Sequence, residues 1–122
     1  MTDLERLSAE QFLYLTTTGR RTGLPREIEI WFGMRGRAVY MLAGGREKSD
    51  WVRNLLANAS VTVRLGDTTF AGAARVLSPD TEEDADARRM LLEKYEPTYS
   101  GDLKEWGESA LPIAVDLGAE IA

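Results

Sequence analysis

The chain has no cysteine and no histidine among its 122 residues. It therefore forms no disulfide, and it lacks the thiolate and imidazole groups that serve nucleophilic triads, zinc centres and most proton shuttles. Both side chains that most often bind haem iron are missing as well. If the protein is an enzyme, we expect the reactive chemistry to belong to a bound organic cofactor, with the chain supplying position and electrostatics. No metal site is expected.

Long apolar runs are also missing. The N-terminus is acidic and has no apolar segment of the signal-peptide type, and no stretch approaches the roughly 20 apolar residues that span a membrane. We therefore expect a cytoplasmic protein with no membrane insertion. The formal net charge of −5 argues against a nucleic-acid partner, because affinity for phosphate backbones grows with the number of neutralised phosphates.

The acidic surplus is unevenly distributed. Residues 1–79 carry eleven Lys/Arg and eight Asp/Glu, whereas residues 80–122 carry four and twelve. The carboxylate run from Asp80 to Asp86 is best interpreted as the first turn of a helix, where the helix dipole favours negative charge. The basic first part leaves room for a small anionic ligand held by a local arginine cluster.

Hydrophobic periodicity predicts one domain over residues 1–122. Strands are predicted at 12–18, 26–32, 38–42, 61–65, 68–77 and 111–117, and helices at 4–12, 50–58, 80–95 and 103–106. Successive hairpins with few helices favour an antiparallel barrel over a parallel doubly wound sheet. We expect a mainly β (α+β) fold of about six to seven strands, with a crossing helix and a C-terminal helix.

Three arginines gather at one turn. Arg20 and Arg21 lie between Gly19 and Gly23, and Arg26 opens the next β-prone segment. Guanidinium groups offer paired donors to phosphate or carboxylate oxygens, and glycine lets the backbone approach a ligand closely. The turn is either an anion site or a hairpin tip with solvated arginines.

This turn is part of an ordered set of motifs. Leu15-Thr16-Thr17-Thr18-Gly19-Arg20-Arg21-Thr22-Gly23 is followed by Pro25-Arg26, by Gly44-Gly45 with Lys48 and Trp51, and by Asn54-Leu55-x-Ala57-Asn58-x-x-Val61-Thr62-Val63. The set resembles the deazaflavin-dependent nitroreductase family, and Pro112-Ile113-Ala114-Val115 lies in a matching place. The resemblance implies a split β-barrel that binds coenzyme F420 in a groove. It also implies hydride transfer from the reduced deazaflavin to an electron-poor small molecule, such as a quinone, an enone or a nitro compound.

The same resemblance assigns residues to the cofactor. The candidates for its phosphate and acidic tail are Arg20, Arg21, Arg26 and Lys48, and those for its ring system are the backbone of Ala43 and Gly44. The loop after Lys48 is one residue shorter than in the family, because only Ser49 and Asp50 separate this lysine from the next tryptophan.

Four further candidates have two interpretations each. Trp51 is a cofactor-binding candidate, but its helical spacing with Leu55 is typical of core packing. Asn54 could bind a phosphate or satisfy a nearby backbone group. Tyr95 and Tyr99 match the substrate end of the groove, where they are the candidate catalytic hydrogen-bond donors, or they simply pack a helix end.

Other functions and an assembly state stay open at this stage. FMN also binds in split barrels with its phosphate on arginines, and three arginines suit one phosphate. A fourth basic group, Lys48, suits a longer polyanionic tail. The chain could also be a non-catalytic protein that binds a cofactor or another amphipathic anion. We expect a homodimer, because Glu29, Trp31 and Tyr40 would give the exposed side of the central strands a partly aromatic surface.

Overall fold

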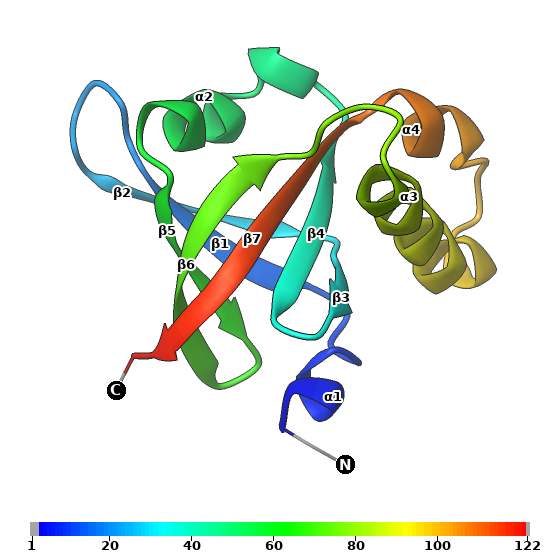
Figure 1. Ribbon diagram of the computed structural model, residues 1–122, viewed down its shortest axis with the longest axis horizontal. Helices are drawn as coiled ribbons and strands as arrows, with labels where there is room; N and C mark the ends of the chain where they lie inside the picture. Colours follow the sequence, from blue (N-terminus) through cyan, green and yellow to red (C-terminus); the bar gives the residue numbers. More distant parts are fainter. Residues whose placement is uncertain (1–2, 122) are drawn as a thin grey trace.

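The computed structural model describes residues 3–121, which form one curled sheet with helices around it (Figure 1). In chain order the elements are α1 (Asp3–Leu7), β1 (Leu13–Thr18), β2 (Pro25–Ile30), β3 (Gly33–Arg35), β4 (Ala38–Ala43), the 3-10 helix η1 (Arg46–Lys48), α2 (Asp50–Ala57), β5 (Ser60–Leu65), β6 (Thr68–Val76), α3 (Glu82–Tyr95), the 3-10 helix η2 (Glu96–Thr98), α4 (Lys104–Ser109) and β7 (Leu111–Glu120). Among these residues, no helix combines the length and the apolar character needed to cross a bilayer.

The strand order in the sheet is β2-β1-β5-β6-β7-β4-β3, and every pairing is antiparallel. β2 and β3 lie at opposite edges of the sheet, although only Trp31 and Phe32 join them in the chain. Such a short connection requires the sheet to curl until its two edges come close together. The predicted antiparallel barrel is confirmed. The predicted strand 26–32 ends two residues early, at Ile30, because the chain crosses the seam of the barrel at Trp31 and Phe32; β3 begins after this crossing and was not predicted.

The barrel interior follows from the alternation of side chains along each strand. One face of each of four strands supplies fully buried side chains: Leu13, Leu15, Val39, Met41, Val63, Leu65, Ile113 and Val115. Helix α2 packs its apolar side, with Val52 and Leu55, against this same core. In Figure 1 this helix lies at one end of the barrel, beside the loop that joins β1 to β2. The predicted core position of Leu55 is confirmed.

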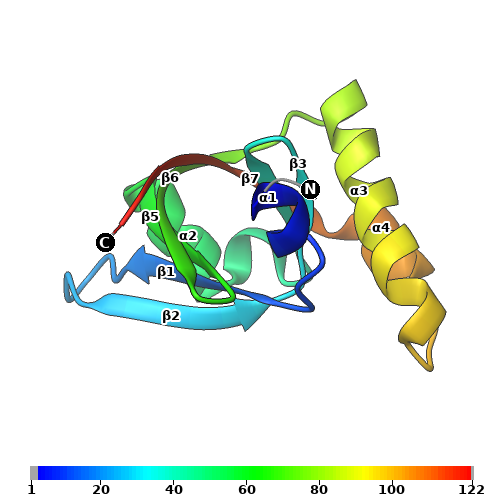
Figure 2. The same ribbon diagram turned by 90° about the horizontal axis from the view of Figure 1, so that it is seen from below.

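A second core lies outside the barrel, under α3. β4 is buried on both faces, so Tyr40 and Leu42 point away from the barrel and pack with Leu91 and Tyr95 of α3. Figure 2 shows α3 and α4 together on this side of the sheet. Tyr40 is only 2% exposed, so its expected place on a solvent-facing dimer surface is wrong. The homodimer itself stays a prediction.

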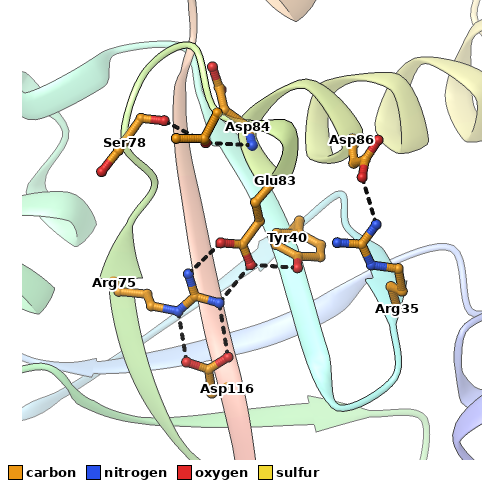
Figure 3. A network of polar contacts seen from close by, with 9 residues as sticks. Arg35, Tyr40, Arg75, Ser78, Glu83, Asp84, Asp86 and Asp116 are labelled. Carbon is orange, nitrogen blue, oxygen red and sulfur yellow. Dashed lines mark hydrogen bonds and ion pairs between the residues drawn. The ribbon is translucent and has the colours of Figure 1, made fainter.

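A polar network holds the start of α3 on the sheet (Figure 3). Arg75 of β6 donates to both oxygens of Glu83 at 2.7 Å and to both oxygens of Asp116, and Tyr40 donates to Glu83 at 2.8 Å. Mainly because Arg75, and then Tyr40, donate to it, the pKa of Glu83 is lowered to about 2. The network therefore joins β4, β6 and β7 to α3, and Glu83 is its contact on the helix.

The acidic run 80–86 begins this helix, as predicted. The side chain of Thr81 accepts a hydrogen bond from the backbone nitrogen of Asp84 at 3.2 Å, which caps the helix. Glu82, Glu83 and Asp84 occupy its first turn. In the part of the chain that the structure describes, no group of three or more His, Cys, Asp or Glu side chains is arranged to hold a metal ion.

Replacing Glu83 with glutamine should make stability less sensitive to acid. Because the folded-state pKa of Glu83 is lowered, its ionised form stabilises the fold above the ordinary glutamate pKa of 4.5, and this stabilisation is lost as the pH falls toward about 2. Urea unfolding of the parent and of Glu83→Gln should therefore differ most near neutral pH and converge in acid. Glu82→Gln, an exposed neighbour in the same helical turn, is the control. A difference between parent and Glu83→Gln that does not change with pH would contradict this account.

Candidate cofactor-binding site

The loop between β1 and β2 is closed by its own backbone. Gly19 donates its N–H to the carbonyl of Leu24 at 2.8 Å, and Gly23 donates to the carbonyl of Gly19 at 2.8 Å. Gly23 has a φ of +71°, a backbone conformation that residues other than glycine rarely adopt. The loop is therefore a compact structure that presents its arginines from a fixed backbone.

A pocket of about 640 Å³ lies beside this loop, between the start of β2 and α2. It is lined by Gly19, Arg20, Arg21, Thr22, Pro25, Arg26, Glu27, Ile28, Asp50, Trp51 and Asn54. We call it the basic pocket. Five of the predicted cofactor-binding residues line it, namely the three arginines, Trp51 and Asn54. Trp51 lines the basic pocket and also packs against the barrel core, so its surroundings are compatible both with cofactor binding and with core packing.

Arg20 is anchored by α2. The side-chain oxygen of Asn54 accepts hydrogen bonds from the backbone nitrogen of Arg20 at 3.2 Å and from its Nη1 at 2.8 Å. The amide nitrogen of Asn54 donates to Thr17 at 3.2 Å, and Arg20 Nη2 also contacts Asp50 at 3.1 Å. Asn54 is 5% exposed and its polar atoms are occupied, which supports its structural interpretation: it positions Arg20. Asp50, one turn before Asn54 on α2, is therefore a residue of this site that the sequence analysis did not identify.

Arg21 and Arg26 are free to bind an anion. Both are exposed, and within residues 3–121 no hydrogen bond or ion pair engages either guanidinium. The Nε atom of Arg26 lies 3.6 Å from the point that a Cβ on Gly19 would occupy, so this side chain crosses close over the loop backbone. The two side chains therefore present uncompensated positive charge at the mouth of the basic pocket.

A second pocket, of about 480 Å³, begins where the basic pocket ends along β2. Its lining is Phe12, Glu29, Ile30, Trp31, Leu42, Tyr99, Asp102, Leu103 and Trp106, and we call it the aromatic pocket. Trp31 lies edge-to-face with Tyr99 at 5.6 Å and with Trp106 at 5.7 Å between ring centroids. From Arg26 to Trp31 an extended strand covers about 17 Å, so β2 connects a basic site to an aromatic one.

The two candidate tyrosines have different surroundings. Tyr95 is 1% exposed and stacks behind Trp31, with ring centroids 4.3 Å apart. Its hydroxyl accepts from the backbone nitrogen of Phe32 and donates to the carbonyl of Gln11, both at 2.9 Å, and burial raises its pKa to about 12. Tyr99 is 47% exposed and lines the aromatic pocket. This geometry supports the packing interpretation for Tyr95, while a catalytic role for either tyrosine stays a prediction.

The remaining predicted residues lie at the end of β4 and in η1, which follows it. Ala43 is buried, and a Cβ on Gly44 would lie 3.6 Å from Trp106, so the glycine borders one wall of the aromatic pocket. Lys48 is exposed on η1 and lines neither pocket, so its role in binding the tail stays a prediction. Sequence reasoning did not identify Trp31 and Trp106 as pocket residues. The sequence feature that could have indicated them is their aromatic character: Trp31 follows a strand end, and Trp106 lies in the helix that comes after Tyr99.

Known proteins share both the sequence and the fold of this chain. Residues 3–118 match the F420H(2)-dependent quinone reductase family. A Mycobacterium tuberculosis F420H(2)-dependent quinone reductase is 30% identical over 91 residues, which cover 72% of this chain and 61% of that relative. A solved F420-H2 dependent reductase is 25% identical with a TM-score of 0.69, covering 88% of this chain and 94% of the other. The heme storage protein HutZ of Vibrio cholerae, 14% identical, shares the fold with a TM-score of 0.76 over 97% of this chain and 89% of its own.

This protein belongs to the F420H(2)-dependent quinone reductase family. Membership confirms the resemblance drawn from the motifs around the basic turn, and the structural matches confirm the split β-barrel. The chain spans 61% of the length of the curated relative, so membership by itself does not transfer that relative's whole activity to it. The HutZ match shows that proteins of different function share this barrel, so the function has to be argued from the site.

Proposed function

We propose that this protein binds coenzyme F420 and uses it to reduce an electron-poor small molecule, of which a quinone is the leading candidate. The observation that carries the proposal is the path along β2, from three arginines at one end to an aromatic pocket at the other. F420 has the matching chemistry, since a phosphate and an acidic tail extend from one end of a planar tricyclic ring.

The residues present fit this cofactor. Arg21 and Arg26 would bind the phosphate and the start of the tail, because their guanidiniums are exposed and unpaired in the described chain. Arg20, held in place by Asn54, would add a third positive charge. Ile28 and Trp51 offer apolar surface in the same pocket for the ring of the cofactor and for the chain that joins this ring to the phosphate.

The chemistry that the bound cofactor supplies is a hydride from C5 of the reduced deazaflavin, which with one proton converts a quinone to a quinol while the deazaflavin is oxidised. The chain's own part is to hold the acceptor against the ring and to exclude water, which the aromatic pocket is suited to do. Tyr99, at its mouth, would donate a hydrogen bond to the acceptor oxygen as negative charge develops there.

One observation favours FMN as an alternative cofactor. Arg20 is already bonded to Asp50 and Asn54, which leaves two fully free guanidiniums, and two suit a single phosphate. A non-catalytic carrier of F420 is the other alternative, since binding alone needs only the basic pocket.

Anaerobic turnover separates an enzyme from a carrier. Reduced F420 mixed with the protein and a neutral naphthoquinone should give oxidised deazaflavin, followed by its absorbance, at a rate that saturates with quinone. A protein that binds F420 but does not accelerate this reaction with any quinone, enone or nitro acceptor is a carrier. The Arg21→Ala, Arg26→Ala double variant should raise the F420 concentration needed for half-maximal rate.

A further inference from the structure

The aromatic pocket carries charge of one sign only. Its two charged lining residues are Glu29 of β2 and Asp102 of the segment before α4. Among the described residues that line it, none is lysine or arginine. The basic pocket at the other end of β2 has three arginines against the two carboxylates of Glu27 and Asp50, so the net charge of the lining changes sign along the groove.

Neither carboxylate forms an ion pair with a described residue. Glu29 Oε2 accepts a hydrogen bond from the hydroxyl of Tyr14 at 2.8 Å, and this bond raises the pKa of Tyr14, so that tyrosine stays a neutral donor. Arg64, stacked over the Tyr14 ring at 4.0 Å, forms its ion pair with Glu27 and not with Glu29. Asp102 accepts from the backbone nitrogen of Lys104 at 2.9 Å. Within residues 3–121, no ion pair involves either carboxylate.

The pocket walls favour the same kind of ligand as the carboxylates do. Trp31 and Trp106 meet at 85°, and Tyr99 meets Trp31 at 85°. A planar ring between such walls contacts both an indole face and an indole edge. The negative face of an aromatic ring attracts cations, most strongly when the ring is tryptophan. A planar cation therefore gains from the walls and from both carboxylates, whereas a planar anion is opposed by the carboxylates.

We propose that the aromatic pocket selects planar acceptors that carry positive charge and discriminates against anionic ones, with Glu29 and Asp102 as the residues that set this preference. The inference rests on the proposed function only in calling the ligand an acceptor. The charge preference of the pocket is a property of this chain and can be measured without any cofactor.

The experiment uses three naphthoquinones with the same ring and different side groups: one neutral, one with a trimethylammonium group and one with a sulfonate. Their binding to the full chain without cofactor is measured by calorimetry, and their turnover with reduced F420 is measured in parallel. The cationic compound should bind at least about fivefold more tightly than the anionic one, and added salt should reduce the difference. Glu29→Gln and Asp102→Asn should each reduce this preference about two- to fivefold.

Glu93→Gln is the matched control, because it removes an exposed carboxylate of α3 that lies outside this pocket. It should leave the preference unchanged. Equal binding of the three compounds, or a preference that both pocket variants retain in full, would overturn the inference. If the binding preference is found but no compound is reduced, the proposed oxidoreductase function fails while the charge selectivity of the pocket stands.

Discussion

Replacing Arg21 and Arg26 together with alanine is expected to weaken the binding of oxidised coenzyme F420 by about a hundredfold or more. Each guanidinium would contribute a charge-assisted contact to the phosphate or the tail, and the loss of one such contact costs about 1.5–3 kcal/mol. Because both side chains are exposed and unpaired in the described structure, the free energy of unfolding should change by less than about 0.5 kcal/mol. Fluorescence titration with F420 and urea unfolding measure the two effects separately.

Arg6→Ala is the control for this pair. Arg6 is an exposed arginine of α1, which Figure 1 shows far from the loop between β1 and β2. The Arg6→Ala substitution removes a positive charge from the protein but changes no residue of the basic pocket, so F420 affinity should stay close to that of the parent. If the double variant binds F420 as tightly as the parent, the turn is only a hairpin tip with solvated arginines.

Asn54→Ala should weaken both folding and F420 binding. The substitution leaves the backbone nitrogen of Arg20 and the hydroxyl of Thr17 without their buried partner, which costs about 1–3 kcal/mol of unfolding free energy. It also releases the guanidinium of Arg20 from the position set by its 2.8 Å bond, so F420 affinity should fall about tenfold. Urea unfolding and F420 titration of the same preparation give both values.

Asn58→Ala, at the residue that follows the last turn of α2, is the matched control. Asn58 is exposed and accepts one hydrogen bond from the backbone of Ser60, so its loss should change stability by less than about 0.5 kcal/mol. If Asn54→Ala lost stability but bound F420 normally, Asn54 would support the fold without positioning Arg20 for the ligand.

The basic turn could be predicted because its information is local. Arg20, Arg21 and Arg26 lie within seven consecutive residues, and Gly19 and Gly23, on either side of the first two, mark the loop that brings the side chains together. The barrel was predictable for a similar reason, since period-two alternation and tight turns define each hairpin. The pairing of Asp50 with Arg20 could not be predicted in this way, because it joins residues 30 positions apart through the packing of α2 on β1.

The aromatic pocket is harder to predict because it is assembled across the seam of the barrel. Trp31 lies in the two-residue connection between β2 and β3, and Trp106 comes from a helix 75 positions later in the chain. The burial of Tyr40 had a weak signal: Ala38-Val39-Tyr40-Met41-Leu42 is apolar on both faces, a pattern typical of strands covered on both sides. Only the position of α3 shows which element covers the second face.

The central claim, that the basic turn binds the phosphorylated tail of F420, is tested most directly by comparing three ligands on the parent and on the Arg21→Ala, Arg26→Ala variant. The ligands are oxidised F420, the same deazaflavin ring and sugar chain without phosphate or tail, and FMN. We expect the parent to bind F420 more tightly than either of the others, and the variant to bind F420 about as weakly as the parent binds the tail-less compound. Equal affinity of the parent for F420 and for the tail-less compound would contradict the claim, and tighter binding of FMN than of F420 would make FMN the cofactor.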